Sequence, residues 1–85
     1  MSADNLIRIK KKENGLYRIT HESASSLVHA LNNIEPTEEE LTMGVIADDI
    51  DNYEDALILA KNCQREIEED GGEVEYGIVD ENWRK

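Results

Sequence analysis

The chain has 85 residues and a formal net charge of −11, and its length fits one small domain over residues 1–85. Phenylalanine is absent, so the core must be built from aliphatic side chains. A single cysteine excludes an internal disulfide, and no stretch approaches the roughly 20 apolar residues that a membrane-spanning helix needs. We therefore expect a soluble, cytoplasmic protein, with residues 80–85 as a tail without a structural pattern.

Residues 5–21 predict a β-hairpin whose turn is Glu13-Asn14-Gly15. A three-residue loop pairs Ile9 with Ile19 and gathers the apolar side chains on one face, whereas a two-residue Asn-Gly loop would mix apolar and polar side chains. Gly15 suits the left-handed position that closes such a loop. The opposite face is basic and is expected to meet water or a partner; it carries Arg8, Lys10, Lys12 and Arg18.

Residues 23–34 predict a short helix, because apolar side chains recur there at helical spacing. Ser23 or Ser25 can cap its start. Pro36 is expected to end it, since proline cannot continue a helix.

Residues 37–40 then repeat a capping pattern, Thr-Glu-Glu-Glu, which is enough for one helical turn. Residues 42–47 follow as a short third strand, interrupted by Gly44.

Residues 51–70 have the strongest helical pattern in the chain. Asp51 stands at an N-cap position, and Glu54 three residues later completes a pair typical of a capping box. Gly71-Gly72 is expected to end the helix. Its apolar stripe consists of Tyr53, Ala56, Leu57, Ala60, Cys63 or Gln64, and Ile67.

Residues 73–79 predict a final strand with Val74, Tyr76 and Ile78 on one face. The element order is then β-β-α-β-α-β. This order predicts an α+β fold: a four-stranded, largely antiparallel sheet with two helices packed on one face.

The opening Met1-Ser2-Ala3-Asp4-Asn5 and the closing Val74-Glu75-Tyr76-Gly77-Ile78 resemble a group of small uncharacterised proteins common in bacteriophages and prophages. The resemblance covers both ends and the main helix, but not residues 22–42. It implies an α+β fold, a phage or mobile-element origin and a location in the host cytoplasm. It implies no activity.

Residues that could carry out chemistry are few. The carboxylates between Asp48 and Asp55 lack the alternating ligands and the glycine of an EF-hand, so helix capping is the more ordinary reading. Cys63 lies on or near the apolar stripe, where a small buried side chain is more usual than a nucleophile. His21 and His29 have no cysteine pair with which to form a zinc site. We predict a non-enzymatic protein with no catalytic residue, no metal and no cofactor.

The charge distribution predicts the kind of partner. Residues 1–21 have a net charge of +3, whereas residues 22–82 carry eighteen carboxylates against two cations. Such a body repels nucleic acid and anionic membranes and attracts basic protein surfaces. We therefore predict an acidic interaction module that binds or inhibits a basic host protein, one that itself binds nucleic acid in the more specific version of the hypothesis.

The residues expected to form the contacts fall into two sets. The acidic set is Glu38, Glu39, Glu40, Asp48, Asp49, Asp51, Glu54, Asp55, Glu66, Glu69, Asp70, Glu73 and Glu75. The secondary set is Arg8, Lys10, Lys12, Arg18 and Trp83.

Two alternatives stay open. In the first, the protein is a homo-oligomer that binds a small ligand at its interface, where Ile58, Leu59 and Trp83 supply apolar surface. In the second, it is an acidic globular domain whose charge serves solubility alone.

Overall fold

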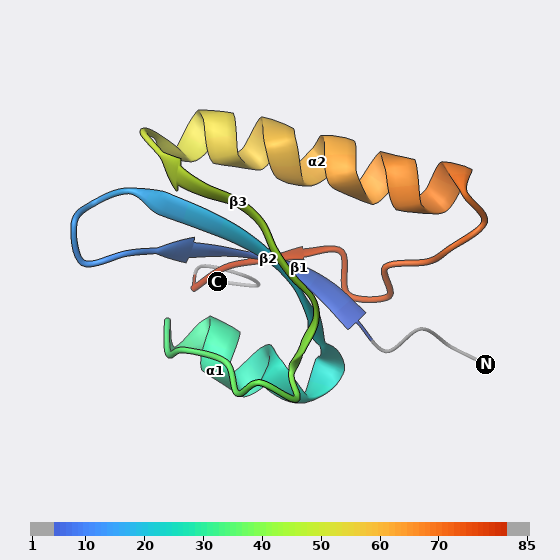
Figure 1. The fold of residues 1–85 in the computed structure, drawn as a ribbon, viewed down its shortest axis with the longest axis horizontal. Coiled ribbons are helices and arrows are strands. Elements are labelled where there is room, and N and C mark those ends of the chain that lie inside the picture. The colour runs from blue at the N-terminus through green and yellow to red at the C-terminus, as the bar shows by residue number, and fades with distance from the viewer. Residues whose placement is uncertain (1–4, 82–85) are drawn as a thin grey trace.

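The computed structural model describes residues 5–81 (Figure 1). Four strands form one sheet in the order β3-β2-β1-β4. This arrangement, with its two α-helices, confirms the predicted α+β class. The elements are β1 (Asn5–Lys11), β2 (Tyr17–Ser23), the 3-10 turn η1 (Ala24–Ser26), α1 (Leu27–Leu31), β3 (Leu41–Ile50), α2 (Tyr53–Glu69) and β4 (Ile78–Val79).

The β1–β2 hairpin has the predicted register. Ile9 lies opposite Ile19, and the backbone N–H of Lys12 donates to the carbonyl of Leu16 at 2.8 Å. The loop is therefore three residues long, and Gly15 ends it at φ +84°. The turn needs this left-handed backbone, which glycine adopts without steric cost.

The sheet is mixed, because β4 runs parallel to β1 whereas the other two pairings are antiparallel. The last strand is also shorter than predicted. The N–H of Gly77 donates to the carbonyl of Val74 at 3.2 Å, and Gly77 has φ +66°. This turn breaks the alternation, so Val74 packs on one side of the sheet and Tyr76 on the other.

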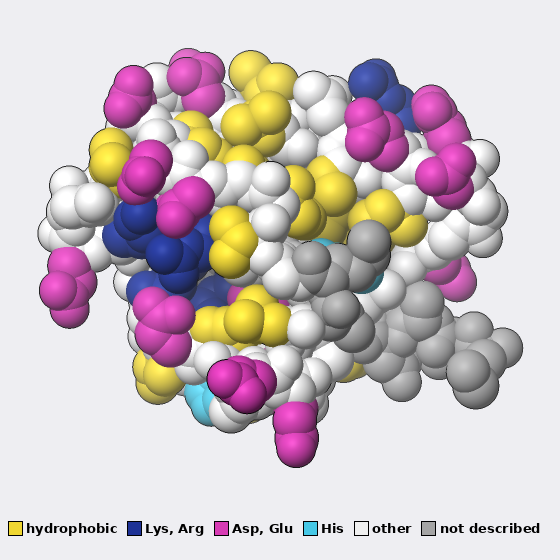
Figure 2. All heavy atoms as spheres, viewed as in Figure 1, with side chains coloured by type: hydrophobic (Ala, Val, Ile, Leu, Met, Phe, Trp, Pro, Cys, Tyr) yellow, Lys and Arg dark blue, Asp and Glu magenta, His cyan; other side chains and the backbone are white. Residues whose placement is uncertain are grey.

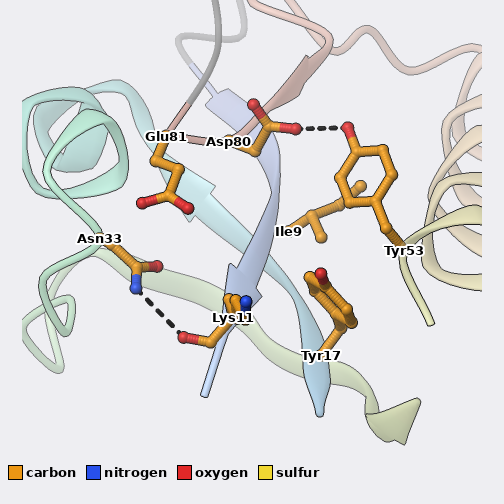
Figure 3. Close-up of a pocket in the computed structure, with 7 residues that line it drawn as sticks. All are labelled: Ile9, Lys11, Tyr17, Asn33, Tyr53, Asp80 and Glu81. Carbon is orange, nitrogen blue, oxygen red and sulfur yellow. Dashed lines mark hydrogen bonds between the residues drawn. The ribbon is translucent and has the colours of Figure 1, made fainter. Parts of the chain in front are cut away.

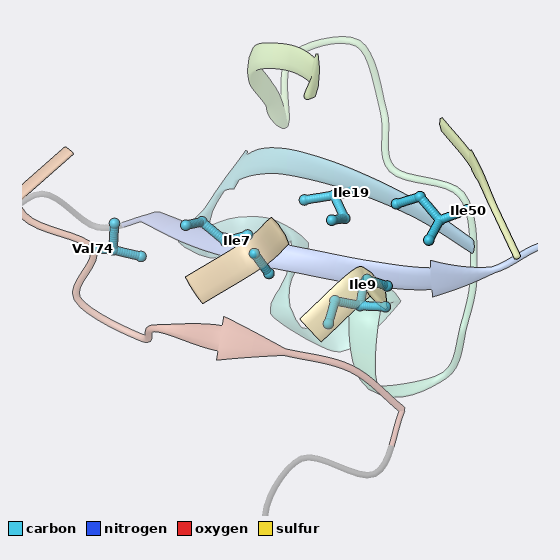
Figure 4. Packing of buried hydrophobic residues seen from close by; sticks show 7 residues of the cluster. Ile7, Ile9, Ile19, Ile50 and Val74 are labelled. Atoms are coloured by element: carbon cyan, nitrogen blue, oxygen red, sulfur yellow. The ribbon is translucent and has the colours of Figure 1, made fainter. Parts of the chain in front are cut away.

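The two helices cover opposite faces of the sheet, so the prediction that both pack on one face is wrong (Figure 1). Ile7 and Ile9 of β1 pack with Ala56 and Ala60 of α2, in the larger core that Figure 4 shows. Leu6 points the other way and packs with Ala30 of α1, Val79 and their neighbours. β1 is thus apolar on both faces at its N-terminal end, so each face of the sheet needs a covering helix there.

The first helix is shorter than predicted. The helical segment spans η1 and α1 and stops at Leu31, because Asn33 adopts φ +55°. The N–H of Ile34 then donates to the carbonyl of His29 at 2.8 Å, and that of Asn33 to Ala30 at 3.3 Å. These bonds form a Schellman motif, so asparagine rather than the later proline ends this helix.

The N-cap of the main helix is Asn52 rather than Asp51. The Asn52 side chain accepts a hydrogen bond from the N–H of Asp55 at 2.9 Å, which is the interaction of an N-cap. Gly71 ends the helix at φ +87°, with Gly72 donating to the carbonyl of Ile67 at 2.9 Å. The predicted glycine stop is confirmed.

Candidate functional site

One acidic candidate, Glu40, is buried inside the protein. Its carboxylate accepts a hydrogen bond from the N–H of Thr37 at 2.9 Å and lies 2.8 Å from Nδ1 of His29. The Thr37 bond above all holds the pKa of Glu40 below its usual value. The capping pattern predicted for residues 37–40 is therefore present, and Glu40 serves it rather than an exposed surface.

Asp48 and Asp49 bind the cations of the hairpin. Nζ of Lys12 lies 2.7 Å from Oδ1 of Asp48 and 2.6 Å from Oδ1 of Asp49, and Nη2 of Arg18 lies 3.3 Å from Oδ2 of Asp48. The hydrogen bond from Lys12 is the largest reason that the pKa of Asp48 falls far below its usual range. Two predicted acidic contacts and two predicted basic contacts are thus paired within the chain.

The basic face of the hairpin is not a solvent-facing strip, because α1 and the following segment cover part of it. Arg8 is fully buried and lies 3.6 Å from Oε1 of the equally buried Glu22. Lys10 is nearly buried and lies 3.4 Å from Glu35. The prediction that these two cations meet water or a partner is wrong, since α1 and the segment that follows it cover this face. Trp83 lies outside the described residues.

The remaining acidic candidates are exposed and separate into smaller groups. Asp51, Glu54 and Asp55 surround the start of α2, Glu38 and Glu39 lie in the turn before β3, and Glu75 follows α2. Figure 2 shows carboxylates along the margins of one face and hydrophobic atoms across its middle. On this face the carboxylates therefore do not form one continuous patch.

Five carboxylates lie in the last turn of α2 or directly after it. The last turn of α2, which the structure describes in full, carries no basic residue. Arg65, one turn earlier, lies 3.9 Å from Glu69 in an exposed pair. The helix C-terminus adds its own partial negative charge. We call this cluster the anionic end of α2: Glu66, Glu68, Glu69, Asp70 and Glu73.

A groove of about 300 Å³ lies beside this cluster, between α2 and β3. Val45 and Ile46 of β3 form one wall and are 51% and 39% exposed. Ile67 forms part of the other wall, and Glu66 and Asp70 stand there with it. We call this feature the α2–β3 groove. Sequence reasoning missed it, because its two walls belong to different elements and come together only when α2 folds back over β3.

Cys63 and His21 also line the α2–β3 groove. Burial raises the pKa of the Cys63 thiol, with a further contribution from Glu66, and burial lowers the pKa of His21. A thiolate beside an imidazolium is the arrangement that activates a cysteine nucleophile. The two pKa shifts favour a neutral thiol and a neutral imidazole instead. Cys63 and His21 are therefore poorly suited to thiolate chemistry near pH 7.

Within residues 5–81, no group of three or more histidine, cysteine or acidic side chains is placed to hold a metal ion. No helix in this part of the chain is both long enough and apolar enough to cross a bilayer. The chain matches no family model, no curated protein and no solved structure. The resemblance of its ends to phage and prophage proteins remains a prediction.

Proposed function

We propose that the protein is a non-enzymatic interaction module, and that its α2–β3 groove binds an extended basic and apolar segment of a partner protein. The observation that carries this proposal is the composition of the groove. Exposed Val45 and Ile46 offer apolar contact, and the carboxylates of Glu66 and Asp70 stand beside them.

The position of β3 supports a partner in extended conformation. β3 is an outer strand of the described sheet and runs for ten residues, Leu41–Ile50. An outer strand offers backbone N–H and C=O groups to an added strand, and alternate side chains of that strand then supply specificity. A segment that alternates basic and apolar residues can place its apolar side chains against Val45 and Ile46 and its basic side chains beside Glu66 and Asp70.

The electrostatics support a cationic partner. The chain has a formal net charge of −11, and the anionic end of α2 adjoins the groove. Long-range attraction of this kind speeds association and weakens as salt rises. The single thiol fits a partner in a reducing cytoplasm, and the phage-like chain ends favour a host protein.

A peptide titration tests the proposal. A labelled peptide of alternating lysine and valine is expected to bind more tightly than its glutamate–valine counterpart, with an affinity that falls as ionic strength rises. Removing both groove charges with Glu66→Gln and Asp70→Asn is expected to weaken binding about fivefold, since two partly exposed ion pairs of about 0.5 kcal/mol each contribute about 1 kcal/mol together.

The matched control is Glu38→Gln with Glu39→Gln, which removes the same charge from a turn outside the groove. This control is expected to keep most of the affinity. Equal losses in the two double variants would show general charge attraction and would overturn the groove proposal. Equal binding of the two peptides would overturn the proposed partner chemistry.

A homo-oligomer is the second candidate, because Ile58 and Leu59 on α2 are 57% and 42% exposed. Such neighbouring apolar side chains are a common feature of protein interfaces. Size-exclusion chromatography with light scattering separates the two candidates. A monomer at high concentration that still binds the basic peptide supports the interaction module alone.

A further inference from the structure

We infer that a second cavity binds an alkylammonium group. This cavity has a volume of about 210 Å³ and lies between the hairpin, the start of α2 and the residues after β4 (Figure 3). Its walls combine two tyrosine rings, two carboxylates and one amide, from Tyr17, Tyr53, Asp80, Glu81 and Asn33. None of these residues lines the α2–β3 groove, so the inference is independent of the proposed function.

The two rings form a fixed aromatic corner. The centroids of Tyr17 and Tyr53 are 5.8 Å apart, with the ring planes at 72°. The Tyr53 hydroxyl donates a hydrogen bond to Asp80, and this bond raises the pKa of Tyr53 to about 12. The phenol is therefore protonated at neutral pH, and its hydrogen bond holds the Tyr53 ring and the Asp80 carboxylate together. A cation near aromatic rings is attracted by their quadrupoles.

The polar groups around the cavity are mainly acceptors. Nδ2 of Asn33 donates to the carbonyl of Lys11 at 3.1 Å, and Figure 3 shows the amide oxygen on the cavity side. The carboxyl group of Glu81 lies across the cavity from Tyr53. A primary ammonium has three donors and no acceptor, so it matches this set, and an anion does not.

Among the described residues that line the cavity, Lys11 is the one whose charge opposes a bound cation. Its side chain is exposed, so its ammonium can turn toward water when a ligand enters. Removing its charge should therefore strengthen amine binding and weaken anion binding. The sign of this change separates the two kinds of ligand.

Nuclear magnetic resonance titration of the full chain tests the inference. The probes are Nα-acetyl-lysine methylamide, which represents a protein side chain, and 1,4-diaminobutane, which represents a free amine. We expect both to shift the amide signals of Ile9 and Tyr53 and the side-chain amide of Asn33. 1-Butanol and the Nε-acetylated lysine probe, which are uncharged, are expected to bind about tenfold more weakly.

Three variants complete the test. Asp80→Asn with Glu81→Gln keeps acceptors for Tyr53 but removes both charges, and is expected to weaken amine binding at least about fivefold. Lys11→Met is expected to strengthen it. The control, Glu38→Gln with Glu39→Gln, removes the same charge outside the cavity and is expected to leave amine binding nearly unchanged.

Each outcome decides the matter. Preference for the lysine probe over the diamine would identify a protein side chain as the ligand, and the reverse preference would identify a free amine. Equal binding of charged and neutral probes, or weaker amine binding in Lys11→Met, would overturn the inference.

Discussion

Replacing Glu22 with glutamine is expected to destabilise the fold by about 3 kcal/mol, because it leaves the charge of Arg8 buried without a counterion. Both side chains are fully buried, and Nη1 of Arg8 lies 3.6 Å from Oε1 of Glu22. At an effective dielectric constant of about 20, two unit charges at this separation attract by about 4.6 kcal/mol. Desolvation of each ion costs several kcal/mol and opposes this attraction.

The hydrogen bonds around the pair are incomplete. Thr20 donates its hydroxyl to Glu22, and Nη2 of Arg8 donates to the carbonyl of His29 at 3.2 Å. Within the described part of the chain, Nε and Nη1 of Arg8 and Oε1 of Glu22 make no hydrogen bond. Burial accordingly lowers the pKa of Arg8 despite the attraction from Glu22. The pair as a whole therefore contributes little net stability, although either member alone is costly.

A comparison of variants by urea unfolding tests this reasoning. A loss of about 3 kcal/mol corresponds to a melting temperature about 12–24 °C lower for a domain of this size. The triple variant Arg8→Met, Thr20→Val, Glu22→Leu removes both charges and the dependent hydroxyl, so it is expected to be much more stable than Glu22→Gln. The exposed Glu38→Gln is the control and should leave stability unchanged. A Glu22→Gln loss below about 1 kcal/mol, or a triple variant as unstable as Glu22→Gln, would refute the reasoning.

Three further predictions concern local structure. Asn52→Ala is expected to lower the free energy of unfolding by about 1 kcal/mol, because the N–H of Asp55 loses its acceptor. Asp51→Ala should leave the free energy of unfolding unchanged, and denaturant titration of both variants shows which residue is the cap. Gly71→Ala is expected to lower the free energy of unfolding by about 1 kcal/mol. The loss comes from the left-handed backbone alone, since no atom lies within 4 Å of an added Cβ. A variant as stable as the parent would contradict this. Because the pKa of Asp48 is depressed, its stabilising contribution is present above the ordinary aspartate pKa of about 3.9 and is lost only as the pH falls through the lower folded-state value. Carboxyl carbon shifts should show that titration moving to higher pH in Lys12→Met.

Local patterns sufficed for the parts of the fold that depend on neighbouring residues. The alternation of Ile7, Ile9 and Ile19 determined the hairpin register, and Gly15 and Gly71 marked backbone positions that other residues adopt only at a cost. These features need no knowledge of distant contacts.

The errors arose where distant segments meet. Arg8 and Lys10 made one hairpin face appear solvent-exposed, yet a buried Glu22 and the cover from α1 place that face inside the protein. No local pattern reports which side of a sheet a connecting helix will cover. The same limit hid the α2–β3 groove, whose walls at Ile46 and Ile67 come together only in the folded chain.

Mapping the bound basic peptide by amide chemical shifts tests the central claim most directly. The proposed function predicts shifts concentrated in β3, around Val45 and Ile46, and in the second half of α2, around Glu66 and Asp70. It also predicts that these shifts shrink together as ionic strength rises. Shifts confined to the turn at Glu38 or the start of α2, or no shifts at any peptide concentration, would contradict it.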